Sequence, residues 1–107
     1  MHTTDHIRGK VIVVTGAGSP GGFGALVSRK AAARGALLVC ADIDESAVRD
    51  TVATIASEGG DAIAVKADVT SIDEMRALAK AAVARFGRID VMVNNAGVMP
   101  LAFFSDH

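Results

Sequence analysis

The sequence of 107 residues predicts an α/β fold, in which helices cover both faces of an open, doubly wound parallel sheet. Four short runs are almost entirely apolar. Such runs are typical of strands buried on both faces, because a strand with one wet face would alternate apolar and polar residues. Three longer stretches with helical spacing lie between these runs, and each ends at a glycine. Strands that alternate with helices favour right-handed parallel crossovers, so the predicted order is β-α-β-α-β-α-β, an incomplete sheet of four strands.

The four predicted strands are rich in Val, Ile, Leu and Ala. Their bounds are residues 10–15, 36–42, 61–68 and 89–94. No internal repeat, linker or low-complexity tract divides the sequence, so residues 1–107 are expected to form one domain. Within it, residues 1–9 are expected to be an N-terminal arm. Residues 98–107 begin no recognisable element and are expected to be an unfinished tail.

The first predicted helix covers residues 22–34 and stops at Gly35. Its residues expected to pack on the sheet are Phe23, Leu26, Val27 and the alanines at 31–33. The second helix is expected to begin after the N-cap Asp44 and to end at Gly59-Gly60. Its apolar face is expected to consist of Val48, Val52, Ile55 and Ala56.

The third predicted helix begins at Ser71-Ile72-Asp73-Glu74, a segment that fits a capping box. In such a box the Ser and Glu side chains each accept a backbone N–H group that the first helical turn leaves unpaired. The helix is expected to end at Gly87. Its packing residues are expected to be Ile72, Met75, Ala79, Ala82, Val83 and Phe86.

The composition excludes several classes of protein. Eleven Lys and Arg residues against 12 Asp and Glu residues leave a net charge of −1, which gives no electrostatic case for nucleic acid or an anionic membrane as a partner. No apolar run approaches the ~18 residues of a membrane helix or forms a signal peptide, so the expected location is the cytoplasm. Cys40 is the only cysteine and is expected to be a buried apolar residue, and no metal site is expected.

The glycine-rich loop between the first strand and the first helix is the strongest functional motif. It runs Thr15-Gly16-Ala17-Gly18-Ser19-Pro20-Gly21-Gly22-Phe23-Gly24. Glycines there let the backbone approach a pyrophosphate, and the unpaired N–H groups at the helix start favour its negative charge. A P-loop would need Gly-Lys followed by Ser or Thr, which is absent. A hydrolase nucleophile elbow fails because its first glycine is replaced by Ala17.

Asp42 ends the second predicted strand and should lie beside the glycine loop. Its carboxylate can accept hydrogen bonds from a ribose 2′-OH. A 2′-phosphate at this place would meet like charge and no cation, because Ile43 follows where an arginine could have helped. The pair therefore favours NAD over NADP. The alternative, that the aspartate only caps the second helix, applies better to Asp44.

Two further polar motifs fall at the same edge of the predicted sheet. Asp68-Val69 ends the third strand, and Asn94-Asn95-Ala96-Gly97 follows the fourth. Each motif alone could be a plain turn or a helix cap. Ligands of open α/β sheets bind at the carboxyl edge of the strands, so the coincidence of these motifs there predicts a binding site.

Together these motifs resemble the N-terminal, cofactor-binding part of the short-chain dehydrogenase/reductase family. The resemblance covers nearly the whole chain. It rests on the loop that ends in Gly22-Phe23-Gly24, on Ala41-Asp42, on Ala67-Asp68-Val69 and on Asn94-Asn95-Ala96-Gly97. It implies a Rossmann-type fold and an NAD-dependent oxidoreductase that transfers a hydride between the cofactor and a small alcohol or carbonyl substrate. It also implies a homo-oligomer for the full-length form.

The resemblance assigns roles to particular residues. Gly16, Ser19, Gly22 and Phe23 would contact the pyrophosphate and the adenosine ribose. Asp42 and Ile43 would select NAD, Asp68 and Val69 would bracket the adenine, and Asn95 would lie by the second ribose. The complete set of expected cofactor-binding residues is Gly16, Gly18, Ser19, Gly22, Phe23, Gly24, Asp42, Ile43, Asp68, Val69, Asn95, Ala96 and Gly97.

Two departures from the family pattern bear on function. Five residues separate Gly16 from Gly22 where the family has three, so the loop is two residues longer. The family's catalytic Ser and its Tyr-x-x-x-Lys follow the Asn-Asn-Ala-Gly motif at a distance, and this chain contains no tyrosine to act as the general acid or base. We therefore expect a cofactor-binding fragment with no catalytic residues, inactive alone. The alternatives are a non-catalytic dinucleotide-binding module and a non-functional truncated remnant.

Overall fold

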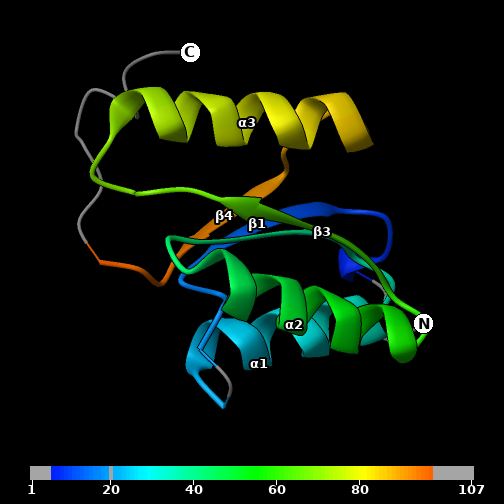
Figure 1. The fold of residues 1–107 in the computed structure, drawn as a ribbon. Helices are drawn as coiled ribbons and strands as arrows, with labels where there is room; N and C mark the ends of the chain where they lie inside the picture. The colour runs from blue at the N-terminus through cyan, green and yellow to red at the C-terminus, as the bar shows by residue number, and fades with distance from the viewer. Residues whose placement is uncertain (1–5, 20, 98–107) are drawn as a thin grey trace.

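A computed structural model describes residues 6–19 and 21–97 (Figure 1). In chain order the elements are β1 (Val11–Thr15), α1 (Phe23–Ala33), β2 (Leu37–Asp42), α2 (Glu45–Ser57), β3 (Asp61–Lys66), α3 (Ile72–Phe86) and β4 (Val91–Asn94). The predicted β-α-β-α-β-α-β order and the α/β fold class are confirmed. The predicted tail at 98–107 and the first five residues of the predicted arm lie outside the described residues.

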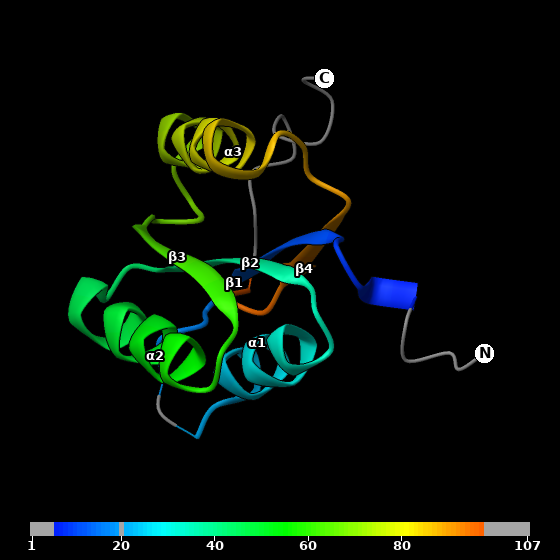
Figure 2. The ribbon, with the colours of Figure 1, turned by 90° about the vertical axis from the view of Figure 1, so that its right-hand side faces the viewer.

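The four strands form one parallel sheet in the order β3-β2-β1-β4. From β1 the chain steps through β2 to β3 in one direction and then crosses back to place β4 on the other side of β1. Helices α1 and α2 consequently lie on one face of the sheet and α3 on the other (Figure 2). The strand order reverses between β1 and β4, and such a switch point is where open α/β sheets bind ligands.

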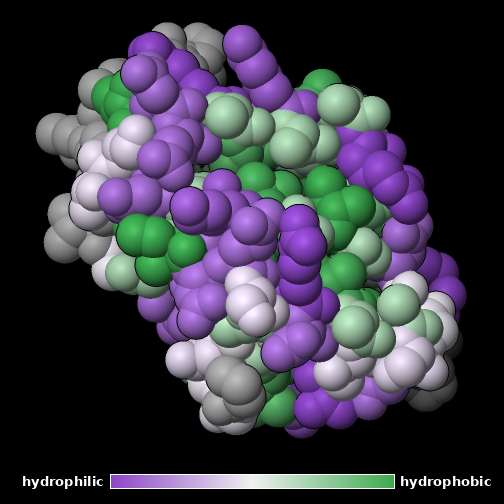
Figure 3. Space-filling view, viewed as in Figure 1, coloured by the Kyte–Doolittle hydropathy of each residue, from purple (hydrophilic) through white to green (hydrophobic). Residues whose placement is uncertain are grey.

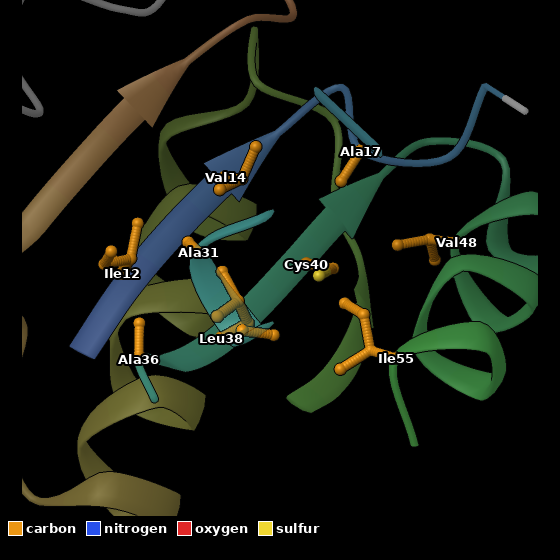
Figure 4. Packing of buried hydrophobic residues seen from close by; sticks show 10 residues of the cluster. Ile12, Val14, Ala17, Ala31, Ala36, Leu38, Cys40, Val48 and Ile55 are labelled. Atoms are coloured by element: carbon orange, nitrogen blue, oxygen red, sulfur yellow. The ribbon is translucent and has the colours of Figure 1, made fainter. Parts of the chain in front are cut away.

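The core consists of two layers, one on each face of the sheet. Alternate residues of a strand point to opposite faces, so Val11 and Val13 of β1 pack toward Met75 and Leu78 of α3. The residues of β1 and β2 that face α1 and α2 form the second layer with small and aliphatic helix residues (Figure 4). The members of this layer labelled there are Ile12, Val14, Ala17, Ala31, Ala36, Leu38, Cys40, Val48 and Ile55.

The two edge strands are less buried than the sequence predicts. All five residues of β1 and the middle four of β2 are buried, whereas the apolar residues of β3 are only partly buried and Val91 of β4 is exposed. In a four-strand sheet only the central pair has a neighbour on each side. Figure 3 shows the result for β3, where hydrophobic surface extends between α3 and α2. The expectation that all four strands are buried on both faces is wrong for the outer two.

Some of the helix residues predicted to pack on the sheet are exposed instead. Phe23 and Leu26 are 64% and 46% exposed, so their predicted packing is wrong. The buried residues of α1 are smaller, namely Gly24, Ala25, Ser28, Ala31 and Ala32. Close contact of Gly24 with the preceding loop sets the rotation of α1, and Phe23 therefore points outward. Ala33 of α1, Ala56 of α2 and Val83 of α3 are also exposed, contrary to the prediction. The buried residues are Val48, Thr51 and Ile55 in α2 and Met75, Leu78 and Ala82 in α3.

The predicted helix caps are confirmed in outline. Asp44 caps α2 by accepting the Ala47 N–H group, and Gly87 ends α3 in the left-handed conformation. At α3, Ser71 accepts the Glu74 N–H group at 3.2 Å, which is half of the predicted capping box. The other half is wrong, because the Glu74 carboxylate accepts the N–H group of Asp68 at 2.9 Å instead. Glu74 thereby bonds the first turn of α3 to the segment that connects β3 with α3.

Cys40 is fully buried in β2, as predicted. Burial raises the pKa of its thiol to about 11, because a thiolate would lose its hydration there. The thiol is therefore protonated at neutral pH and unreactive.

Asp90 fastens the start of β4 to the start of β1. Its Oδ2 atom accepts the Val11 N–H group and the Arg88 Nε–H group, both at 2.8 Å. These bonds, the one from Val11 foremost, hold the pKa of the Asp90 carboxyl below its ordinary value. A carboxyl with a lowered pKa stabilises the fold above its unfolded-state pKa, near 4, and loses that contribution as the pH falls through the lower folded value.

Replacing Asp90 with asparagine is therefore expected to flatten the acid side of the stability profile. Wild type should lose melting temperature as the pH falls from 6 to below about 4, and Asp90→Asn should start lower at pH 6 and lose less over that range. Thermal melting at several pH values measures both. Equal losses in the two proteins would contradict a role for the Asp90 carboxylate.

Candidate functional site

The glycine loop leaves β1 and enters α1 with its backbone close to the end of β4. Gly16 has a φ of +68°, a conformation that favours glycine. A Cβ atom at Gly16 would lie 3.1 Å from the Ala96 backbone nitrogen, and one at Gly24 would collide with the Gly16 carbonyl oxygen and lie 2.9 Å from Asn95 Nδ2. These two glycines permit β1, α1 and the segment after β4 to meet at one point.

A turn closes the loop directly before α1. The Gly22 N–H group donates to the Ser19 carbonyl at 2.9 Å, and Gly21 between them has a φ of +74°. Gly22 then serves as the N-cap of α1, with no side chain bonded to the helix start. The first intrahelical bond runs from the Leu26 N–H to the Gly22 carbonyl at 3.0 Å. The N–H groups of the first turn therefore have no acceptor within the helix, and no acidic residue lies there.

Thr15, the last residue of β1, joins the loop to the segment after β4. Its buried hydroxyl oxygen accepts the N–H groups of Asn95 at 3.1 Å and Ala96 at 3.3 Å. The hydroxyl also lies 2.9 Å from Asn94 Oδ1. The Asn95 side chain in turn donates to the Gly16 carbonyl at 3.3 Å. Hydrogen bonds from one buried side chain thus position the turn after β4 against the glycine loop.

Asp42 ends β2 beside the loop, as its position in the sequence predicts. Its Oδ2 atom accepts the Gly18 N–H group at 2.8 Å, and its Oδ1 atom accepts the Asp44 N–H group at 3.0 Å. A Cβ atom at Gly18 would lie 2.9 Å from Asp42 Oδ2 and 3.1 Å from the Ala47 side chain. Gly18 therefore leaves room for the aspartate and α2. A carboxylate has about four lone-pair positions, so Asp42 retains capacity for further donors.

These elements surround a groove of about 600 Å³ at the carboxyl edge of the sheet. Asp42 and Asp68 are the charged residues among those that line it, so the described lining carries negative charge and no cation. Its lining consists of Gly16, Ser19, Gly22, Phe23, Asp42, Ile43, Ala67, Asp68, Val69, Thr70, Asn95 and Ala96. A smaller cleft of about 230 Å³ lies between α1 and α2 and shares no lining residue with the groove.

Asp68 accepts two hydrogen bonds from its neighbour Thr70. The Thr70 hydroxyl donates to Asp68 Oδ1 at 2.7 Å and the Thr70 N–H group donates to the same atom at 2.9 Å. These bonds lower the pKa of the Asp68 carboxyl below its ordinary range, the hydroxyl contributing most. An ionised carboxylate at a groove wall can accept a hydrogen bond from an amino group of a ligand.

Ten of the 13 residues expected from the sequence to bind a cofactor line the groove, and three do not. Gly18 and Gly24 lie behind the lining, where they allow close backbone contacts. Gly97 follows the lining residues, and its carbonyl accepts a bond from the Asn94 side chain. Ala67 and Thr70 also line the groove and Thr15 supports it, although none of the three was among the residues expected to bind a cofactor. Thr70 directly follows the Asp68-Val69 motif, so its place could have been inferred.

Residues 6–19 and 21–97 contain no group of His, Cys, Asp and Glu side chains that could hold a metal ion. Among the described helices, none has both the length and the apolar character to cross a membrane.

Comparison with known proteins assigns the chain to one family of oxidoreductases. Residues 10–107 match the family model described as short chain dehydrogenase. The 7alpha-hydroxysteroid dehydrogenase of Escherichia coli strain K12 is 39% identical over 99 residues, which are 91% of this chain and 38% of that enzyme. The chain thus spans well under half the length of this relative.

Solved structures agree with this family match. A hydroxysteroid dehydrogenase from Escherichia coli superposes with a TM-score of 0.84 at 36% identity, over 97% of this chain and 47% of that one. A short chain dehydrogenase/reductase from Burkholderia phymatum, solved in complex with NAD, superposes with a TM-score of 0.77 at 43% identity. That match covers 80% of this chain and 30% of the other.

Proposed function

The chain belongs to the short-chain dehydrogenase family of oxidoreductases, and we propose that its groove binds NAD, the cofactor of hydride transfer. The observation that carries the proposal is the convergence of an uncapped helix N-terminus and an aspartate at the end of β2 on one groove. The nicotinamide cofactor would supply hydride transfer. The residues of this chain would bind and orient it.

The pyrophosphate would bind at the start of α1. The N–H groups of the first helical turn have no acceptor within the helix, and the partial positive charge of a helix N-terminus favours an anion. Gly22 and Ser19 line the groove beside this helix start, and the Ser19 hydroxyl could donate to a phosphate oxygen. The close approach that Gly16 and Gly24 allow brings this helix start to the switch point.

The adenosine half would bind between β2 and β3. Asp42 would accept the ribose hydroxyls, and Asp68 with Val69 would border the adenine. Ile43 is 62% exposed next to Asp42 and provides apolar surface without positive charge. Because no described lining residue is a cation, the extra phosphate of NADP would be repelled by Asp42. Asn95 and Ala96 would lie by the second ribose.

For the whole protein we propose NAD-dependent oxidation or reduction of a small alcohol or carbonyl compound, in a cytoplasmic homo-oligomer. Family membership supports the reaction type, and the hydroxysteroid dehydrogenases among the relatives act in that chemical class by name. The 107 residues contain no tyrosine to act as the proton donor and acceptor of the reaction. We propose that this chain by itself binds the cofactor without turning over a substrate.

The test is a pair of matched substitutions of neighbouring aspartates. Asp42→Asn removes the charge that would face the ribose, and its affinity for NAD is expected to fall by about 10-fold or more, the usual value of a hydrogen bond to a charged group. Its preference for NAD over NADP should fall as well. Asp44→Asn makes the same change of charge two residues away, and asparagine is an equally good N-cap.

Calorimetric titration of wild type and both variants with NAD and NADP gives six affinities, and hence one NAD-to-NADP preference ratio for each of the three proteins. Asp44→Asn should bind like wild type. A wild-type chain that prefers NADP, or an Asp42→Asn variant with unchanged preference, would contradict the proposed role of Asp42.

A further inference from the structure

Thr51 lies on the buried face of α2 and bonds outside its own helix. Its hydroxyl donates to the carbonyl oxygen of Ala17 in the glycine loop at 2.7 Å. The side chain is 6% exposed, and its neighbours on the same helix face are the apolar Val48 and Ile55. A valine would fill this space equally well, so the hydroxyl is what distinguishes Thr51 from an ordinary core residue.

The hydroxyl has a choice of acceptors, and the loop is the closer one. Threonines in helices commonly donate to the carbonyl four residues earlier. For Thr51 that acceptor is Ala47, at 3.4 Å, compared with 2.7 Å for Ala17. Thr54, one turn further along α2, makes the ordinary bond to the Asp50 carbonyl at 3.0 Å. The Thr51 hydroxyl therefore bonds mainly to the glycine loop and not to its own helix.

The bond holds one end of a peptide group whose other end Asp42 holds. The carbonyl of Ala17 and the N–H of Gly18 belong to the same planar peptide unit. Thr51 donates to its oxygen, and Asp42 accepts its N–H group at 2.8 Å. The Ala17 N–H group also donates to the Ala41 carbonyl at 3.0 Å. A rotation of this peptide unit would break the bonds to Thr51 and Asp42 together, so its orientation is fixed from both sides.

We propose that Thr51 is a positioning residue for the cofactor site, because with Asp42 it clamps the Ala17–Gly18 peptide and sets the course of the glycine loop. The clamp also fixes the Oδ2 atom of Asp42 on the loop, while Oδ1 accepts the Asp44 N–H group and the side chain still lines the groove. The effect on cofactor binding rests on the proposed NAD site. The clamp itself can be measured without cofactor.

Three variants of the 107-residue chain separate these effects. Thr51→Val keeps the shape and removes the hydroxyl, Thr51→Ser keeps the hydroxyl, and Thr54→Val removes a hydroxyl that bonds only within α2. NMR follows the Ala17 carbonyl carbon and the Gly18 amide. Thr51→Val is expected to shift both signals and to speed exchange of the Gly18 amide by about 10-fold. The other two variants should match wild type.

A second measurement determines the NAD affinity of wild type and the same three variants. NAD affinity is expected to fall about 5- to 10-fold in Thr51→Val, the usual range for one net hydrogen bond, and to be retained in Thr51→Ser and Thr54→Val. Unchanged loop signals in a folded Thr51→Val variant would overturn the clamp. Altered loop signals with unchanged NAD affinity would overturn its role in binding. A wild type that binds no NAD would refute the proposed function, while the loop signals would still decide the clamp.

A measurement on the unaltered chain covers the case in which Thr51→Val does not fold. A hydroxyl proton held in a buried bond exchanges slowly with water. The Thr51 hydroxyl is expected to give a protected proton signal. The hydroxyl of the half-buried Thr54, whose hydrogen bond is exposed to solvent, is expected to exchange quickly. Equally fast exchange of both would overturn the proposal.

Discussion

Replacing Gly24 with alanine is expected to lower the free energy of unfolding by about 3 kcal/mol, the upper range for overpacking a tight site. A Cβ atom there would collide with the Gly16 carbonyl oxygen and approach Asn95 Nδ2 to 2.9 Å. Both contacts involve the loop and the turn after β4, so cofactor binding should be lost as well. Helix propensity alone predicts the opposite sign, because alanine in a helix is favoured over glycine by up to ~1 kcal/mol.

Gly59→Ala is the matched control for this prediction. Gly59 has a φ of +88° with open space around it, so its substitution costs only backbone strain, roughly 1 kcal/mol, and leaves the groove intact. Denaturant unfolding and NAD titration measure both variants. A Gly24→Ala variant as stable as wild type would show that β1, α1 and the turn after β4 do not meet as described.

Replacing Thr15 with valine is expected to lower the free energy of unfolding by about 2 kcal/mol. The change keeps the shape of the buried side chain but leaves the N–H groups of Asn95 and Ala96 without their acceptor. An unsatisfied buried group costs about 1–3 kcal/mol, and partial access of water to this turn reduces the total. NAD affinity should fall too, because Asn95 loses its position beside the groove.

Thr15→Ser retains the hydroxyl and provides the comparison. It is expected to lose only the packing of one methyl group, about 1 kcal/mol, and to retain NAD binding. The difference between valine and serine at this position isolates the hydrogen bonds. Equal NAD affinities in the two variants would contradict the positioning of the turn by Thr15.

The arrangement of the chain was predictable because its signals are local or periodic. Apolar runs, glycine stops and the N-cap Asp44 fix the elements, and alternation of strands with helices fixes the parallel order. The face that a helix buries depends on contacts between distant segments. The close contact of Gly24 with Gly16 sets the rotation of α1, and Phe23 and Leu26 are therefore exposed. The spacing of apolar residues within α1 does not reveal this contact.

The location of the candidate site was predictable from the strand order, whereas the residues that support it from behind were not. Residues at the ends of parallel strands must share an edge, so Asp42, Asp68 and Asn95 could be placed together from the sequence. The support from Thr15 and Thr51 could not, because each hydroxyl bonds a backbone group far away in the chain. The role of Gly18 also needed the structure, which reveals the close approach of Asp42 behind the loop.

The most direct test of the account is the wild-type arm of the cofactor titration, followed at every backbone amide by NMR. NAD is expected to cause saturable shifts at residues 16–19 and 21–24, around Asp42, at Asp68 to Thr70 and at Asn95 and Ala96, with NADP binding more weakly at the same amides. A folded chain that shows no saturable shift with NAD would contradict the proposed site. Shifts centred on the cleft between α1 and α2 would contradict it equally.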